Sequence, residues 1–253
     1  MYIDLNCDMG ESFGMYTLGL DDQVMPLISS ANVACGFHAG DPQVLRRTVE
    51  LARCCGTGIG AHVSFPDLSG FGRREMNATP AEVENDTLYQ LGAIYGFCKA
   101  AGVALRHIKP HGALYNMAQK DRPLADAIVR AVAVFDRNLL VFAQPGSALE
   151  AAAQTAGLSA VSEVFADRAY TADGTLASRK LPGAVIHDPE QVAARAVRMV
   201  THGSVTAIDG SEVPLRAETI CVHGDTPGAV ELIRRIRDGL AAAGVTVAPA
   251  AAR

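Results

Sequence analysis

Tryptophan is absent from the 253 residues, and the six cysteines, spread from residue 7 to residue 221, form no C-x-x-C pair. Cysteines scattered in this way in a chain of this length are typical of reduced, mostly buried thiols rather than of a disulfide frame. We therefore expect the protein to work in the cytoplasm.

Basic residues are also not in excess. The chain carries 22 Lys and Arg against 27 Asp and Glu, a net charge of −5, whereas proteins that bind the phosphate backbone usually present a basic face. No apolar run approaches the roughly 20 residues of a membrane helix. The acidic start, MYIDLNCDMGE, lacks the basic and apolar regions of a signal peptide. These absences argue against nucleic-acid and membrane partners.

Short apolar runs alternate instead with longer segments of helical period, which is the pattern of β-then-α units. The expected strands are residues 2–6, 31–35, 58–62, 105–109, 139–143, 160–165 and 219–223, and the expected helices are 41–55, 79–101, 122–135, 147–156, 189–201 and 227–243. Short links between such units imply parallel strands with right-handed crossovers. The outcome is either an open doubly wound sheet or a closed barrel.

The polar residues that follow the strands favour the barrel. Nearly every expected strand ends in a polar cluster, and convergent clusters fit a ring better than the single crevice of an open sheet. The apolar content of 49% suffices for one large core, so we expect a single (β/α) barrel domain over residues 1–253. The long linker 166–188 interrupts the spacing and is interpreted as a lid or a partner-binding loop.

Each cluster holds side chains suited to chemistry, although any one alone is equally typical of a helix cap or a turn. Arginine suits bidentate binding of carboxylate or phosphate. Lys109 and His111 are two residues apart, so in an extended chain they point the same way, as in sites that polarise a carbonyl and move a proton. The alternative for Lys109 is a purely structural pair with Glu163 that ties strands together. The candidates in chain order are Asn6, Asp8, Glu11, Asn32, His38, His62, Arg73, Lys109, His111, Tyr115, Asn116, Glu163, Asp167, Arg168, His223 and Asp225.

Seven segments of the sequence resemble the LamB/YcsF family, which is the family of the A subunit of 5-oxoprolinase. They are DLNCDMGESFG, SANVACGFHAGDP, GAHVSFPDLSGFGRR, IKPHGALYN, EVFADRAY, PGAVIHDPE and CVHGDTPGAVEL, in the family's order from the first strand to the last helix. Val63 departs from the family, since many members are expected to have proline there.

The resemblance implies a (β/α)7-type barrel of parallel strands, related to glycoside hydrolases and polysaccharide deacetylases. It also implies hydrolysis of the lactam of 5-oxo-L-proline to L-glutamate, coupled to ATP hydrolysis, in a complex with subunits B and C. The chain has no G-x-x-x-x-G-K-[ST] loop and no G-x-G-x-x-G after a strand. ATP, with Mg²⁺, must therefore bind through other groups or be used by the partners, and no redox cofactor is expected.

On this resemblance the candidates divide into two groups. The catalytic group comprises Asp8, Glu11, His38, His62, Lys109, His111 and His223, in which one histidine, with Asp8 or Glu11, activates water. The substrate-binding group comprises Asn6, Asn32, Arg73, Tyr115, Asn116, Glu163, Asp167, Arg168 and Asp225, in which Arg73, together with Lys109, holds phosphate or carboxylate.

Two alternatives from other classes stay open. The first is a metal-dependent deacetylase in which Asp8, His38, His62 and His223 converge on a divalent ion. Against it, the one H-x-x-x-H pair, His107 and His111, begins within the expected strand 105–109 and not after it, and the ligands would come from four separate loops. The second is a non-catalytic subunit that only delivers substrate to its partners, which the density of ionisable groups argues against.

Overall fold

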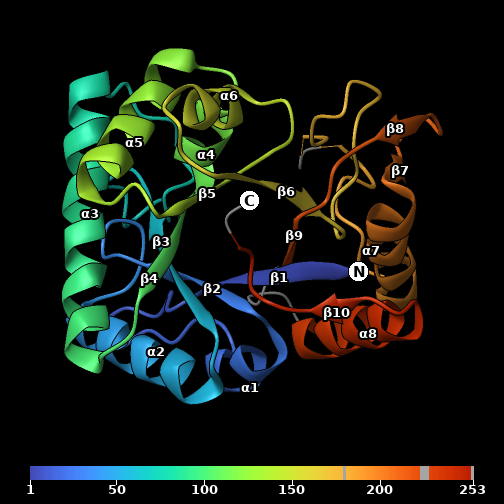
Figure 1. The fold of residues 1–253 in the computed structure, drawn as a ribbon, viewed down its shortest axis with the longest axis horizontal. Coiled ribbons are helices and arrows are strands. Elements are labelled where there is room, and N and C mark those ends of the chain that lie inside the picture. Colours follow the sequence, from blue (N-terminus) through green and yellow to red (C-terminus); the bar gives the residue numbers. More distant parts are fainter. Residues whose placement is uncertain (179–180, 223–227, 252–253) are drawn as a thin grey trace.

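The computed structural model describes residues 1–178, 181–222 and 228–251. Within these residues, seven parallel strands close into a barrel (Figure 1). They are β1 (Tyr2–Met9), β2 (Ser30–Ala34), β3 (Gly58–Val63), β4 (Leu105–Pro110), β5 (Leu140–Ala143), β6 (Ala160–Phe165) and β9 (Thr219–Val222). Strand β9 pairs with both β6 and β1, and this pairing closes the ring. The predicted seven-stranded barrel is confirmed.

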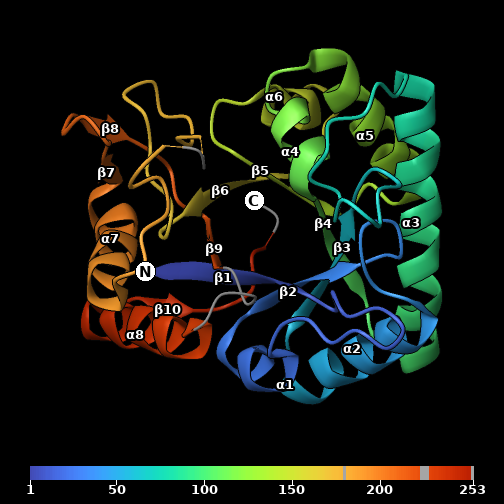
Figure 2. The ribbon, with the colours of Figure 1, turned by 180° about the vertical axis from the view of Figure 1, so that it is seen from behind.

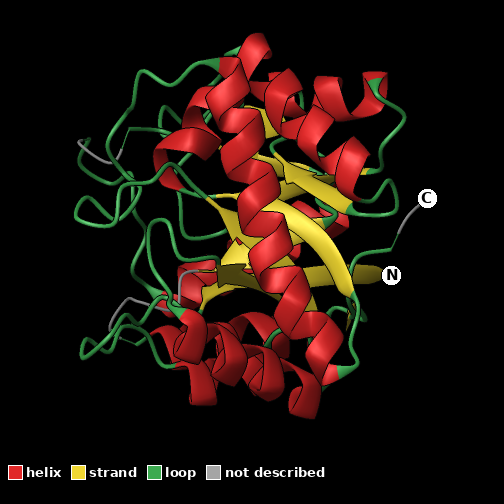
Figure 3. Ribbon diagram, turned by 90° about the vertical axis from the view of Figure 1, so that its left-hand side faces the viewer, coloured by secondary structure: helices red, strands yellow, loops and turns green. Residues whose placement is uncertain are grey.

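Helices surround this ring on its outer side (Figures 2 and 3). The long helices are α2 (Pro42–Cys55), α3 (Pro80–Ala101), α5 (Arg122–Phe135), α6 (Ala148–Thr155), α7 (Pro189–His202) and α8 (Ala229–Ala242). Helix α3 packs on α5, and α7 packs on α8. In the part of the chain that the structure describes, no helix is long and apolar enough to cross a membrane.

The ends of the helices follow from local sequence signals. Asp41 accepts hydrogen bonds from the backbone N–H groups of Gln43 and Val44, which caps α2. Thr79 and Glu82 form a reciprocal capping box at the start of α3. Both helices end at a glycine in the left-handed conformation, Gly56 and Gly102, which a residue with a Cβ adopts only at a cost. The expected boundaries of these helices therefore agree with the structure to within one residue.

Several short elements were not predicted. They are α1 (Asp21–Val24), the 3₁₀ helix η1 (Met25–Leu27), α4 (Gly112–Ala118), the hairpin strands β7 (Ser204–Thr206) and β8 (Glu212–Pro214), and β10 (Thr246–Val247). None has more than seven residues, which is too short for a hydrophobic period to develop. Strand β10 pairs with the start of β1, outside the ring.

The interior of the barrel is polar, although such barrels are usually filled by branched apolar side chains. Alternate residues of a strand point to opposite sides. Leu5 and Cys7 of β1 thus join the apolar core, while Asn6 hydrogen-bonds to Glu163 of β6 and Thr219 of β9 inside the ring. The large apolar core lies between the strands and the surrounding helices, and the polar interior leads to the candidate site.

The linker 166–188 folds back on itself in its described part, with bridges between Arg168 and Val185 and between Tyr170 and Leu176. The Arg168 guanidinium donates hydrogen bonds to the carbonyl oxygens of Ala177, at 2.7 Å, and Ala184, at 3.3 Å. Arg168 therefore braces this loop from within. Its role as a lid or partner-binding loop stays a prediction.

Candidate active site

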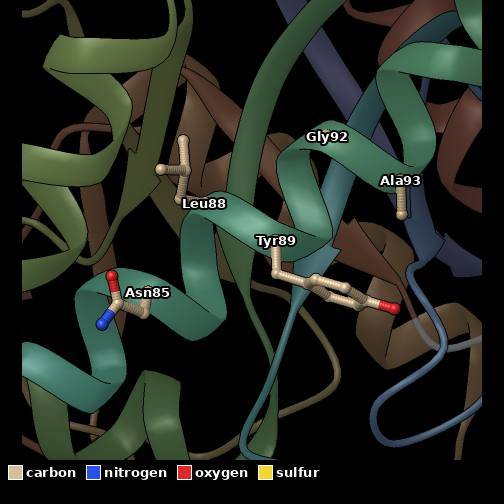
Figure 4. Close-up of a pocket in the computed structure, with 5 residues that line it drawn as sticks. All are labelled: Asn85, Leu88, Tyr89, Gly92 and Ala93. Atoms are coloured by element: carbon tan, nitrogen blue, oxygen red, sulfur yellow. The ribbon is translucent and has the colours of Figure 1, made fainter.

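A cavity of about 1230 Å³ opens at the C-terminal ends of the strands. Its floor carries Asp8, His62, Lys109 and His111, and its wall includes part of the linker 166–188. A second depression lies on the outer face of α3 and is lined by Asn85, Leu88, Tyr89, Gly92 and Ala93 (Figure 4). That depression has no carboxylate, histidine, lysine or arginine in its lining, so the chemistry of the described residues points to the cavity above the barrel.

Lys109 lies at the centre of the cavity floor and is almost completely buried. Its ammonium nitrogen is 2.8 Å from Oε1 of Glu163 and 3.1 Å from Oδ1 of Asp8. It also donates to Oδ1 of Asn6 at 3.2 Å and to Sγ of Cys221 at 3.0 Å. Because its partners come from β1, β6 and β9, Lys109 ties the interior of the barrel together from β4.

Two amide side chains and one neutral histidine, hydrogen-bonded to one another, support Lys109 and Asp8 inside the barrel. Asn32 donates to Oδ1 of Asn6 at 2.7 Å and to Oδ1 of Asp8 at 2.9 Å. Nε2 of His107 lies 2.8 Å from Oδ1 of Asn32. Burial, followed by the positive charge of Lys109, lowers the pKa of His107 to about 3. His107 is therefore neutral at physiological pH and donates its Nε2–H to Asn32.

The charges of this centre hold each other in the ionised state. Burial alone would raise the pKa of Asp8, but His62 and Lys109 hold it well below its usual value. Burial alone would lower the pKa of Lys109, but Asp8, Cys221 and Glu163 raise it well above its usual value. Burial, and next the Glu163 carboxylate, raise the pKa of Tyr115, whose hydroxyl donates to Oε2 of Glu163 at 2.6 Å. The cavity floor thus presents a lysine cation between two carboxylate anions.

Three histidines meet beside this centre. The His38 ring stacks on the His111 ring with centroids 4.0 Å apart, and both lie edge-on to His62. Gly72, with φ of 63°, lies against them, and a Cβ there would come within 2.9 Å of His38 Cβ. Phe71, with φ of 55°, is the one non-glycine residue at positive φ in the described chain. Such strained backbone is enriched at functional sites.

The other candidates occupy more peripheral positions. Arg73 is exposed at the cavity mouth, with its guanidinium carbon 5.0 Å from the Phe71 ring centroid. Asn116 is exposed on α4 and also lines the cavity. The buried Asp167 supports the linker, since its backbone oxygen accepts from Ile186 N at 2.8 Å. His223 and Asp225 lie outside the described residues.

Sequence reasoning therefore selected residues that the fold brings together: Asp8, Glu11, His38, His62, Lys109 and His111. Their catalytic roles stay predictions. It missed His107, Thr219 and Cys221, which lie inside the barrel on β4 and β9. Alternation could have found His107 and Cys221, because His107 is two residues before Lys109 and Cys221 two before His223. Gly60 gave a second signal, because a glycine inside a strand often marks the close approach of another group. In the structure a Cβ at Gly60 would lie 2.0 Å from Nε2 of His107.

Comparisons with known proteins give consistent findings. Residues 3–253 match the LamB/YcsF family. A protein of Symbiobacterium thermophilum, named as the A subunit of 5-oxoprolinase, is 60% identical over 97% of this chain and 94% of that protein. The crystal structure of a lactam utilization protein from Thermus thermophilus is 51% identical, covers 98% of this chain and 99% of its own, and superposes with a TM-score of 0.95.

A more distant neighbour bears on the fold alone. A polysaccharide deacetylase from Bacillus cereus is 12% identical, covers 98% of this chain and 90% of its own, and gives a TM-score of 0.50. The expected likeness to the barrels of deacetylases is thus confirmed, without any implication for the reaction.

Proposed function

The chain belongs to the LamB/YcsF family, and we propose that it is the A subunit of an ATP-dependent 5-oxoprolinase, which opens the lactam of 5-oxo-L-proline to L-glutamate. Two similarities support this proposal: the 60% identity to a protein named as the A subunit of 5-oxoprolinase, and the near-identical fold of a lactam utilization protein. Both similarities extend over almost the whole chain.

The observation that carries the proposal is the position of Lys109 between Asp8 and Glu163 on the cavity floor. Lactam hydrolysis adds water to the carbonyl carbon, breaks the ring C–N bond and protonates the ring nitrogen. As water attacks, negative charge is concentrated at the carbonyl oxygen or, once that oxygen is phosphorylated, on its phosphoryl group. A fixed ammonium group in a buried site stabilises that charge more strongly than water does. Lys109 would serve in this role.

Asp8 lies beside Lys109 on the cavity floor, and its Oδ2 is 3.2 Å from Nε2 of His62. A carboxylate held in the ionised state can accept a hydrogen bond from the attacking water and orient it. In the proposed reaction, Asp8 and the histidines beside it activate this water. Arg73 at the mouth would hold the carboxylate of the substrate, since a guanidinium forms paired hydrogen bonds with a carboxylate.

ATP enters the proposal through partner subunits B and C. A lactam is stabilised by resonance, and phosphorylation of its oxygen would make the ring carbon more reactive toward water. The chain carries neither of the two glycine-rich nucleotide motifs named above. We therefore assign ATP and Mg²⁺ to phosphorylation by the partners, and hydrolysis of the activated ring to this barrel. Water adds to the ring carbon, the ring C–N bond breaks with protonation of the nitrogen, and a second water releases phosphate from the resulting acyl phosphate to give glutamate. The linker 166–188, which borders the cavity, would contact either the substrate or a partner.

The proposal is tested by measuring glutamate released from 5-oxoproline with this chain, with subunits B and C, and with all three together. ATP-dependent glutamate is expected only from the complete mixture. Robust release by the chain alone would show that the division of labour is wrong. No release from the complete mixture would refute the function itself. A variant that still binds substrate and partners but has no turnover would rule out a role limited to binding.

A further inference from the structure

Four side chains beside Lys109 could together bind a metal ion, a role that the proposed lactam chemistry does not assign to them. Glu11 follows β1, His38 follows β2, His62 is in β3 and His111 follows β4. One ligand atom from each lies within 4.8 Å of every other. The three histidines are at most 5% exposed, and Glu11 is 9% exposed. Consecutive strands of the ring thus direct three imidazoles and a carboxylate to one buried point.

The tautomers of two of these histidines are fixed by backbone carbonyl groups. Nδ1 of His62 lies 2.9 Å from the carbonyl oxygen of Lys109, and Nε2 of His111 lies 2.9 Å from that of Phe71. A carbonyl oxygen only accepts hydrogen bonds, so each of these nitrogens carries its proton. The strained backbone at Phe71 places one of the two carbonyl groups.

When both rings are neutral, their inner nitrogens consequently face each other as lone pairs. Nε2 of His62 and Nδ1 of His111 are 2.9 Å apart. Two neutral rings with these tautomers have no proton to share across that distance, and none to donate to Oδ2 of Asp8, which lies 3.2 Å from Nε2 of His62. A cation between them, either a proton or a metal ion, is needed to make the contact favourable.

His38 distinguishes between these two cations. Both of its ring nitrogens are buried and have no hydrogen-bond partner in the described structure. Its Nε2 is 3.8 Å from Oε1 of Glu11, beyond hydrogen-bonding distance. A proton shared by His62 and His111 leaves both His38 nitrogens unsatisfied, whereas a metal ion bound at the cluster would be a partner for one nitrogen of each ring. Buried polar atoms without partners are rare, and an absent ion is one of their explanations.

We propose that Glu11, His38, His62 and His111 bind a divalent transition metal ion of the zinc class. Imidazole nitrogens with one carboxylate oxygen suit zinc and its neighbours, at about 2.0–2.2 Å from the ion. The carbonyl oxygens of Lys109 and Phe71 act as the outer partners that orient ligating histidines. The charge of nearby Lys109 is offset by Asp8 and Glu163, so it leaves no net positive charge to repel the ion.

The test is ion binding by the isolated chain, measured after removal of metal with a chelator. Zn²⁺ is titrated against a competing chelator, and Co²⁺ is used for its visible spectrum. The background carries Cys54→Ser and Cys55→Ser, because these adjacent exposed thiols could bind zinc on their own. We expect one ion per chain and a four-coordinate Co²⁺ spectrum.

Ligand variants are compared with a histidine outside the cluster. His38→Ala and His111→Ala should weaken binding by about 100-fold or more, because loss of a ligand costs more than the 10–100-fold cost of losing an outer partner. His202→Ala, exposed at the end of α7, should bind as the parent does. Zn²⁺ should raise the melting temperature of the parent and of His202→Ala but not of the ligand variants. Glu11→Gln, which conserves size, replaces any variant that fails to fold.

Two results would overturn the site. In the first, the parent chain takes up far less than one ion, and NMR shows an imidazolium at His62. A proton shared by His62 and His111 then occupies the place proposed for the ion. The other is unchanged affinity in the folded ligand variants. Ion binding is measured without subunits B and C, so its failure is distinct from failure of the glutamate assay.

Discussion

The ammonium nitrogen of Lys109 lies 2.8 Å from Oε1 of Glu163, and both side chains are buried. This pair joins β4 to β6 across the interior of the barrel. The same nitrogen lies 3.1 Å from Asp8 on the cavity floor. The structural tie and the proposed reacting group are therefore one side chain, so a single substitution at Lys109 affects both stability and turnover.

Lys109→Met is expected to lower the free energy of unfolding by about 3–5 kcal/mol, the usual cost of removing one partner of a buried ion pair. Turnover by the folded variant should fall by roughly 100-fold or more, because the developing oxyanion loses its cation. Urea unfolding measures the first effect. Glutamate release with subunits B and C, at a temperature where the variant is folded, measures the second.

A double variant separates the two effects. Lys109→Met with Glu163→Gln removes the uncompensated carboxylate at Glu163 and leaves an amide within reach of Asn6 and Tyr115, which contact Glu163 in the wild type. Stability should recover in part while turnover stays low. Wild-type turnover in either variant would remove Lys109 from the reacting centre.

Tyr115→Phe tests the hydrogen bond that the Tyr115 hydroxyl donates to Glu163. The Tyr115 hydroxyl donates to Oε2 of Glu163 at 2.6 Å, and hydrogen bonds to charged groups contribute about 1.5–3 kcal/mol. We expect the free energy of unfolding, measured in urea, to fall by about that amount in Tyr115→Phe. The control is Tyr95→Phe, since Tyr95 is 46% exposed and surface changes stay within about 0.5 kcal/mol. Equal losses in the two variants would contradict the role of the Glu163 hydrogen bond.

The sequence predicted the barrel because each strand and long helix carries its own local signals. Apolar runs gave the strands, while Asp41, Thr79, Gly56 and Gly102 marked the ends of α2 and α3. The short elements α4 and β10 carry no comparable signals. Strand β10 is defined by its pairing with β1, which is a long-range contact.

The histidine cluster shows why residue spacing alone was insufficient at the site. The proposed ligands come from four loops or strands, and the same dispersal counted against the set Asp8, His38, His62 and His223 when only the sequence was considered. In the closed ring, β1, β2, β3 and β4 are consecutive neighbours, and His62 is directly opposite Lys109 in the register. Residues far apart in sequence become adjacent because neighbouring parallel strands lie about 4.8 Å apart.

Gly60→Ala tests the packing inside the barrel. A Cβ at Gly60 would lie 2.0 Å from Nε2 of His107, so the His107 ring must move and its bond to Asn32 is disturbed. Overpacking of this kind costs about 1–3 kcal/mol in urea unfolding. Gly92→Ala is the matched control, because nothing lies within 4 Å of a Cβ there. Gly92 is exposed in the middle of α3, where replacing glycine with alanine should raise the free energy of unfolding by about 0.5–1 kcal/mol. A tolerated Gly60→Ala would contradict the placement of His107.

The stability of the protein should fall in acid partly through His107. Its pKa is lowered from 6.5 to about 3 by burial and then by Lys109, so between these values only the unfolded chain binds the proton. The free energy of unfolding therefore decreases as the pH falls below 6.5, by up to about 1.4 kcal/mol per pH unit from this group. His107→Gln removes the titrating ring, and urea unfolding between about pH 6 and pH 4 should show a shallower pH dependence than in the wild type. Phe142→Leu removes the ring stacked on His107 but keeps the histidine, so it controls for lost packing and should retain the wild-type slope. Equal slopes in His107→Gln and the wild type would show that His107 is not held neutral in the folded protein.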